Sequence, residues 1–285
     1  MCNLTKSVLI LILILLLQLW VYAIFLKPVI TTWGATKSEI DAPMAGDKKS
    51  LLLITSTRAI LINVPKHTVW QWLMQLGADR AGFYSYDFIE NALGYKTRYP
   101  NLIQPRFENL QVGDVVRGST NDQQSLISYN FPVTYIKAED TFVLENWGTF
   151  LLKKVSDQQT RLIIRTQEKR SQNIFISVFN YLFVPFHYIM ERRMLIGVKL
   201  HAEGKLGIQY SRGMDILWTS SIALSECLIA LLIFIGRGLM QSLVLPACLS
   251  VLCLLLVLLF NPTPVYSVAL LLILCLLYLK RLSFR

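Results

Sequence analysis

Residues 82–91 read GFYSYDFIEN, a run of aromatic, acidic and small polar side chains. Ser85 is a good helix N-cap, because its hydroxyl can accept a hydrogen bond from a backbone N–H of the first turn. Asp87 and Glu90 follow where acidic side chains favour the helix dipole. We therefore predict a short helix over residues 85–93, ahead of the alternative that the two carboxylates share a proton or bind a cation.

The segments before this stretch predict a strand and then a helix. Residues 50–64 are first apolar and then alternate, as a half-buried strand does, and Pro65 ends the pattern. Residues 67–76 place apolar side chains on one side of a helix, and Gly77 is a natural stop.

The segments after it predict several short strands and one long helix. Turn residues separate the strands, which is typical of an antiparallel sheet. The helix covers about residues 173–201, broken or kinked at Pro185 because proline lacks a backbone donor. This order predicts an α+β fold whose curved sheet can wrap the last helix and leave a cavity. The predicted strands are residues 114–117, 128–137, 141–145, 150–155 and 161–167.

Three blocks of sequence stand out between residues 33 and 203. They are residues 33–36 with 43–47, residues 57–73 with 82–91 and 112–114, and residues 187–195 with Gly197 and Lys199. Together they resemble the SRPBCC superfamily, the START and Bet v 1-like proteins often labelled polyketide cyclase/dehydrase, and within it a bacterial membrane-anchored subgroup. The resemblance implies a helix-grip fold around a hydrophobic cavity. It does not imply one activity, because the fold serves lipid transfer, sensing and cyclisation alike.

Four apolar segments have the length of membrane spans, since a helix needs about 20 apolar residues to cross a bilayer. We predict an N-terminal anchor over residues 1–32, a helix-grip domain over 33–212 and C-terminal transmembrane helices over 213–285. The basic residues near the span ends are too balanced to assign the side of the membrane. We expect an integral protein of the bacterial cytoplasmic membrane, with spans at residues 8–26, 216–235, 239–260 and 262–279.

Composition excludes several other classes of protein. Of the 285 residues, 54% are hydrophobic and only 16% are charged, so a purely soluble protein is not expected. The net charge is +10, but no dense stripe of Lys and Arg appears, and we expect no nucleic acid partner. The central region has no cysteine, which removes a Cys-based zinc site or nucleophile there. We predict no cofactor and no metal.

His187 and Glu191 are four residues apart on the predicted long helix and therefore share one of its faces. A His–Glu pair lining a cavity could act as an acid–base couple or bind a polar ligand head. The alternative is an ordinary surface ion pair. His187, Glu191 and Asp87 are thus the candidate catalytic residues.

A second set of side chains is predicted to contact a ligand. Its members are aromatic, sulfur-containing or acidic, and they come from the predicted helices, the GFYSYDFIEN stretch and one strand end. They are Trp70, Phe83, Tyr84, Tyr86, Glu90, Trp147, Met190 and Met194.

Two further patterns remain open at this stage. An arginine that points into the cavity needs a partner, and we expect Glu145, Asp114 or an acidic ligand to provide it. The candidates are Arg58, Arg106, Arg117 and Arg165. The aromatic run 175–189 is too short to span a membrane, and we expect it to pack in the core, with an interfacial, lipid-facing segment as the alternative.

The leading interpretation is a membrane-tethered binding protein for a lipid or another apolar or amphipathic small molecule. It is preferred because the central region lacks a nucleophile with a base and an orienting group. The alternatives are a cyclase, dehydrase or hydrolase that acts on such a molecule, and a membrane assembly or interaction factor.

Overall fold

The computed structural model describes residues 2–48, 53–92, 102–107, 109–120, 130–169 and 172–283. Residues 50–52, residue 93 and residues 128–129 of the predicted elements lie outside these ranges. The chain divides into two compact units, one of residues 31–206 and one of residues 1–30 together with 207–285.

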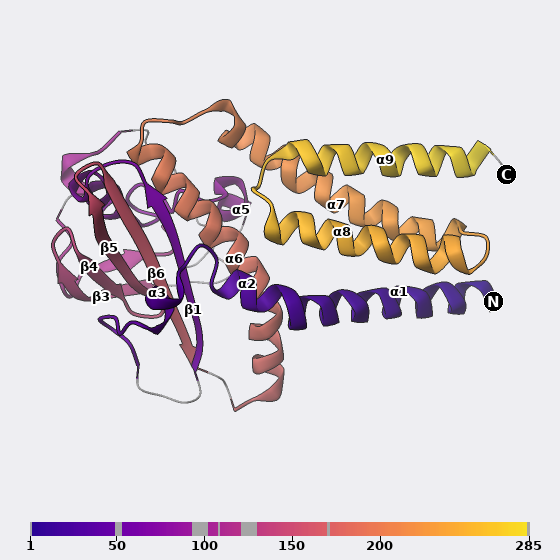
Figure 1. Ribbon diagram of the computed structural model, residues 1–285, viewed down its shortest axis with the longest axis horizontal. Helices are drawn as coiled ribbons and strands as arrows, with labels where there is room; N and C mark the ends of the chain where they lie inside the picture. The colour runs from indigo at the N-terminus through magenta and orange to yellow at the C-terminus, as the bar shows by residue number, and fades with distance from the viewer. Residues whose placement is uncertain are drawn as a thin grey trace. The chain divides into compact units, whose positions relative to one another are not determined.

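The first unit is built on a six-stranded antiparallel sheet with the order β1-β6-β5-β4-β3-β2 (Figure 1). Neighbours in the sheet are mostly neighbours in sequence, except that β6 returns to pair with β1 along ten residues, Leu53–Ile62. The α+β class predicted from the sequence is thus confirmed. The strands are β1 (Leu53–Ile62), β2 (Val115–Arg117), β3 (Asn130–Lys137), β4 (Thr141–Leu144), β5 (Gly148–Ser156) and β6 (Gln159–Lys169).

Helices α4 (Lys66–Leu73), α5 (Asp87–Ala92) and α6 (Ile174–Ala202), with the short η2 (Pro105–Phe107), complete this unit. The second half of α6 packs with α4 and one face of the sheet, and their buried side chains form the hydrophobic core. Of the break or kink predicted at Pro185, the break is wrong, because α6 is one helix of 29 residues with Pro185 inside it.

Residues 33–48, which we call the strap, cross the opposite face of the sheet. The strap contains α3 (Lys37–Asp41), whose Thr36 and Glu39 form a capping box. Along β6, Arg161 and Arg165 alternate with core residues and therefore point to the strap. Arg161 donates to the carboxylate of Glu39 at 2.8 and 2.9 Å. Arg165 donates at 2.7–2.8 Å to Asp47 and to the carbonyl oxygens of Glu39, Ile40 and Ala42.

The second unit is a bundle of apolar helices that lie side by side (Figure 1). Within it, Ser221 Oγ of α7 donates to Ser267 Oγ of α9 at 2.7 Å, which satisfies two buried hydroxyls. Counted over the described residues of both units, five helices are long and apolar enough to cross a membrane, and α6 of the first unit is one of them. The elements are α1 (Cys2–Val21), η1 (Tyr22–Leu26), α2 (Lys27–Thr31), η3 (Ile208–Tyr210), α7 (Arg212–Ile235), η4 (Met240–Val244), α8 (Leu245–Leu259) and α9 (Pro264–Ser283).

Candidate functional site

A buried ion pair joins the first strand to the long helix. Arg58 Nη1 of β1 lies 2.9 Å from Glu191 Oε2 of α6, and each side chain is 1% exposed. Thr166 Oγ1 of β6 donates to the same carboxylate oxygen at 3.4 Å. Since an isolated buried charge is costly, each charge makes the other tolerable in the core.

His187 lies one helical turn before Glu191 and extends the pair toward the surface. Its Nε2 is 3.5 Å from Glu191 Oε2, and its side chain is 30% exposed. The structure therefore brings together the two candidate catalytic residues predicted from their spacing. It also adds Arg58, which the sequence did not connect to them.

Tyr188 holds a second arginine next to this pair. Arg192 Nη1 donates to the Tyr188 hydroxyl at 3.2 Å. The guanidinium carbons of Arg58 and Arg192 lie 5.2 and 4.9 Å from the centre of the Tyr188 ring, within the range of cation–π attraction. Burial raises the pKa of Tyr188, so its hydroxyl stays protonated and available as a hydrogen-bonding group.

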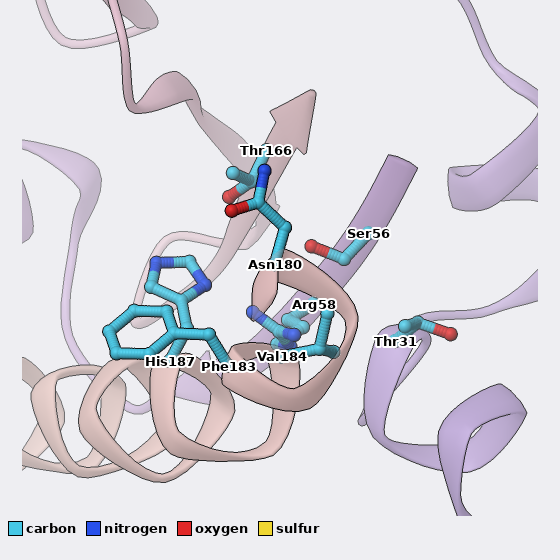
Figure 2. Close-up of a pocket in the computed structure, with 8 residues that line it drawn as sticks. All are labelled: Thr31, Ser56, Arg58, Thr166, Asn180, Phe183, Val184 and His187. Carbon is cyan, nitrogen blue, oxygen red and sulfur yellow. The ribbon is translucent and has the colours of Figure 1, made fainter. Parts of the chain in front are cut away.

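A small pocket lies beside the ion pair, between α6, the strands β1 and β6, and Thr31, the first residue of this unit (Figure 2). Its free volume is about 20 Å³, which is room for about one water-sized group. Six of its eight lining residues have polar side chains, although apolar atoms, including those of an apolar strip of α6, make up most of the wall surface. The lining residues are Thr31, Ser56, Arg58, Thr166, Asn180, Phe183, Val184 and His187.

The first part of α6, residues 174–186, exposes apolar side chains next to this pocket. Phe175 is 83% exposed and Phe179 60%, and Phe179 stacks on Phe183 with 5.8 Å between ring centres. The expectation that the aromatic run packs in the core is therefore wrong for this part of the helix, although Tyr188 is buried. We call it the apolar half of α6; its exposed members are Ile174, Phe175, Ile176, Val178, Phe179, Leu182 and Phe186.

The GFYSYDFIEN stretch is docked on another side of α6. Tyr84 has a positive φ of 55°, and an added Cβ on Gly197 would lie only 2.2 Å from the Tyr84 carbonyl oxygen. Ser85 Oγ donates to the Met190 carbonyl at 2.8 Å. The prediction that Ser85 caps the following helix is therefore wrong: α5 begins at Asp87, and this hydroxyl serves α6.

The other predicted ligand-binding side chains are dispersed through the core and around it. Trp70 and Met194 are buried in it, and Phe83 packs 5.6 Å from Trp147. Tyr84 and Tyr86 are buried, Glu90 is buried in α5, and Asp87 and Met190 are half-buried. None of these side chains lines the pocket beside Arg58. Of the predicted catalytic and ligand-binding residues, His187 lines it.

A second, larger pocket of about 150 Å³ lies between the strap and the turn that joins β4 to β5. Trp147 lines it, together with Asp47 and Arg165. The Arg165 guanidinium already binds Asp47 and three strap carbonyls, so its role is to hold the strap on the sheet.

The two side chains predicted as partners of an inward arginine, Glu145 and Asp114, are wrong, whereas the third alternative, an acidic ligand, stays a prediction. Arg58 pairs with Glu191 and Arg165 with Asp47, at 2.9 and 2.8 Å, and not with Glu145 or Asp114. The other two candidates are exposed; they are Arg106 and Arg117. In the part of the chain that the structure describes, no three His, Cys, Asp or Glu side chains are grouped as metal ligands would be.

Comparisons with known proteins find distant structural likeness alone. No family model matches the chain, and no curated protein matches it. A conserved protein of unknown function from Enterococcus faecalis is 16% identical, covers 55% of this chain and 76% of its own, and has a TM-score of 0.37. The Aha1 dimer from Colwellia psychrerythraea is 17% identical, covers 54% and 99%, and has a TM-score of 0.31. A structural genomics target from Staphylococcus saprophyticus is 12% identical, covers 55% and 98%, and has a TM-score of 0.33. Likenesses of this size assign neither a family nor a function to the chain.

Proposed function

We propose that the chain is a membrane-tethered helix-grip protein that binds an apolar or amphipathic small molecule, such as a lipid. The polar end of the molecule would enter the pocket beside Arg58. Its apolar part would lie along the apolar half of α6. The host membrane would be the bacterial cytoplasmic membrane.

This proposal rests on one observation: the pocket beside Arg58 and the exposed apolar half of α6 adjoin each other on the same helix. Phe183 and Val184 line the pocket, and the exposed Phe179 stacks on Phe183. A polar recess that opens beside a contiguous apolar strip matches the two ends of an amphiphile. Exposed apolar patches of this kind are typical of surfaces that meet a lipid or a partner.

The connection to the first apolar helix supports the choice of lipid. Thr31 is the last residue of the helix Leu4–Thr31, which is long and apolar enough to span a membrane, and Thr31 also lines the pocket. Thr31 therefore connects the pocket wall directly, along the chain, to a segment that is apolar enough to enter a membrane.

Acid–base catalysis on such a molecule is the second candidate function. The 3.5 Å separation of His187 Nε2 and Glu191 Oε2 favours it, because His187 lines the pocket and Glu191 lies behind it. Binding is preferred because the same Glu191 oxygen also contacts Arg58 and Thr166, which ties the carboxylate to the core. An assembly factor with an unused pocket is the third possibility; it has no single observation in its favour.

The test is native mass spectrometry and lipid extraction of the full chain purified in a mild non-ionic detergent. We expect an amphiphile at about one copy per chain. The Asn180→Phe variant, which fills the pocket from α6, should lower this occupancy, whereas Val155→Phe, at an exposed position of β5 outside the pocket wall, should not. No bound molecule, or equal occupancy in both variants, would contradict the proposal.

A further inference from the structure

We propose that the pocket beside Arg58 selects a carboxylate, so that the bound molecule is a long-chain carboxylic acid. This inference rests on the proposed function and names the ligand class for the same site. It follows from the charge of the pocket wall, from its hydrogen-bonding groups and from its size.

The charge of the wall favours an acid. None of the eight described lining residues is Asp or Glu, and the titratable or charged ones are Arg58 and His187. Glu191 contacts both, at 2.9 and 3.5 Å, but it is not part of the wall and its side chain is 1% exposed. A ligand therefore meets the guanidinium and the imidazole, which are cationic or hydrogen-bond donors.

Of the remaining polar groups of the wall, Thr31, Ser56 and Asn180 carry hydrogen-bond donors, whereas Thr166 donates its one hydroxyl proton to Glu191. Thr31, Ser56 and Thr166 present hydroxyls and Asn180 presents an amide, and Figure 2 shows the Asn180 side chain directed toward Thr166. A guanidinium has five N–H donors, so Arg58 can serve a ligand oxygen as well as Glu191. Carboxylate oxygens are acceptors only and fit such a wall better than an alcohol or an amine does.

The size of the pocket separates a carboxylate from larger acidic heads. A free volume of about 20 Å³ admits one small oxygen-bearing group at a time. A phosphodiester with its glycerol would have to stay partly outside this space. The apolar strip of Phe183 and Val184, continued by Phe179, then receives the hydrocarbon chain.

The experiment measures equilibrium binding of radiolabelled probes to the full chain in nanodiscs of phosphatidylcholine. The probes are oleate, oleyl alcohol and dioleoyl phosphatidic acid, with acetate as an unlabelled competitor. We expect saturable oleate binding that is at least about tenfold tighter than that of the alcohol or of phosphatidic acid, and no competition by acetate at matched ionic strength.

Two variants link the preference to the wall. The double exchange Arg58→Met with Glu191→Met removes both buried charges together and should bring oleate and oleyl alcohol to similar affinity. His187→Gln should weaken oleate more than it weakens oleyl alcohol. Arg117→Gln removes a cation whose side chain is 57% exposed and outside the wall, and should change neither affinity.

The outcomes separate this inference from the proposed function. Equal, saturable binding of oleate and oleyl alcohol to the unmodified chain leaves the proposed function standing and overturns the carboxylate preference. Phosphatidic acid that binds as tightly as oleate also overturns it, because the size argument then fails. If no probe binds saturably, or if acetate displaces oleate as effectively as oleate itself does, both proposals fall.

Discussion

Arg58 Nη1 and Glu191 Oε2 lie 2.9 Å apart, and both side chains are 1% exposed although they come from the first strand and the last helix of the same unit. The contact thus links the two ends of this unit's fold. It also fixes the position of α6 over the sheet at the level of the pocket, because His187 and Thr166 converge on the same carboxylate oxygen.

Removing one member of this pair should destabilise the unit far more than removing both. In Arg58→Met, Glu191 keeps its charge in the core without the guanidinium, and we expect a loss of about 3–5 kcal/mol in the free energy of unfolding. The double variant with Glu191→Met should recover most of this loss. Denaturant unfolding of the full chain, followed by tryptophan fluorescence, measures both. Equal losses in the single and double variants would show that the ion pair is not the cause.

Replacing Gly197 by alanine should loosen the contact between α6 and the GFYSYDFIEN stretch. The new Cβ would lie 2.2 Å from the Tyr84 carbonyl oxygen, well inside contact distance, so helix or loop must move. Overpacking of this kind costs about 1–3 kcal/mol. Gly213→Ala is the control, because a Cβ there meets no atom within 4 Å. The same unfolding measurement applies, and an unchanged midpoint for Gly197→Ala would refute the close approach.

The strap should be bound less tightly in acid. The hydrogen bonds from Arg161 lower the pKa of Glu39 from 4.5 to about 2 in the folded chain. A depressed pKa contributes stability that is fully present above pH 4.5 and is lost as the pH falls toward 2. The difference in unfolding free energy between the unmodified chain and Glu39→Gln should therefore shrink over this range.

Asp41→Asn provides the control for this titration, because the Asp41 side chain lies in the same short helix and is 58% exposed. It should change the unfolding free energy little at any pH. A Glu39→Gln difference that stays constant between pH 4.5 and 2 would contradict the assignment of this acid response to Glu39.

The apolar half of α6 should contribute to binding without contributing much to stability. Phe179 is 60% exposed and lies beside the pocket residue Phe183, so Phe179→Ser removes surface that a hydrocarbon chain would cover. We expect reduced retention of the co-purifying amphiphile and an unchanged unfolding midpoint. Val155→Ser removes a similarly exposed apolar side chain from β5, 56% exposed, and should leave retention unchanged. Equal retention in both variants would count against a role for this surface.

Much of the fold follows from local sequence pattern. Residues 150–155 and 161–167 are bounded by turn residues, which predicts β5 and β6, and the structure extends each by only a few residues. The pattern of residues 173–201 likewise predicts α6. Such elements are decided by local signals of this kind, which a single sequence carries.

Only part of the candidate site could be predicted from the local sequence pattern. The spacing of His187 and Glu191 predicts their proximity, because both lie on one helix. The contact to Arg58 depends on where α6 lies over β1, which alternation along a strand does not specify. Ser85 was misassigned for the same reason: its partner is the Met190 carbonyl, a distant group on another element.

The missing side chain at Gly197 also limits how α6 can move. The Tyr84 carbonyl packs against this position, and the larger Arg193 and His201 lie one turn away on either side of it. Together these groups form an axial stop, so the helix cannot slide along its length. Any adjustment to an arriving ligand must then come from bending or rotation ahead of the stop. Pro185, where one backbone hydrogen bond of the helix is lacking, stands between that stop and Phe183 of the pocket wall. The first part of α6 can thus bend or rotate while the helix stays fixed at Gly197.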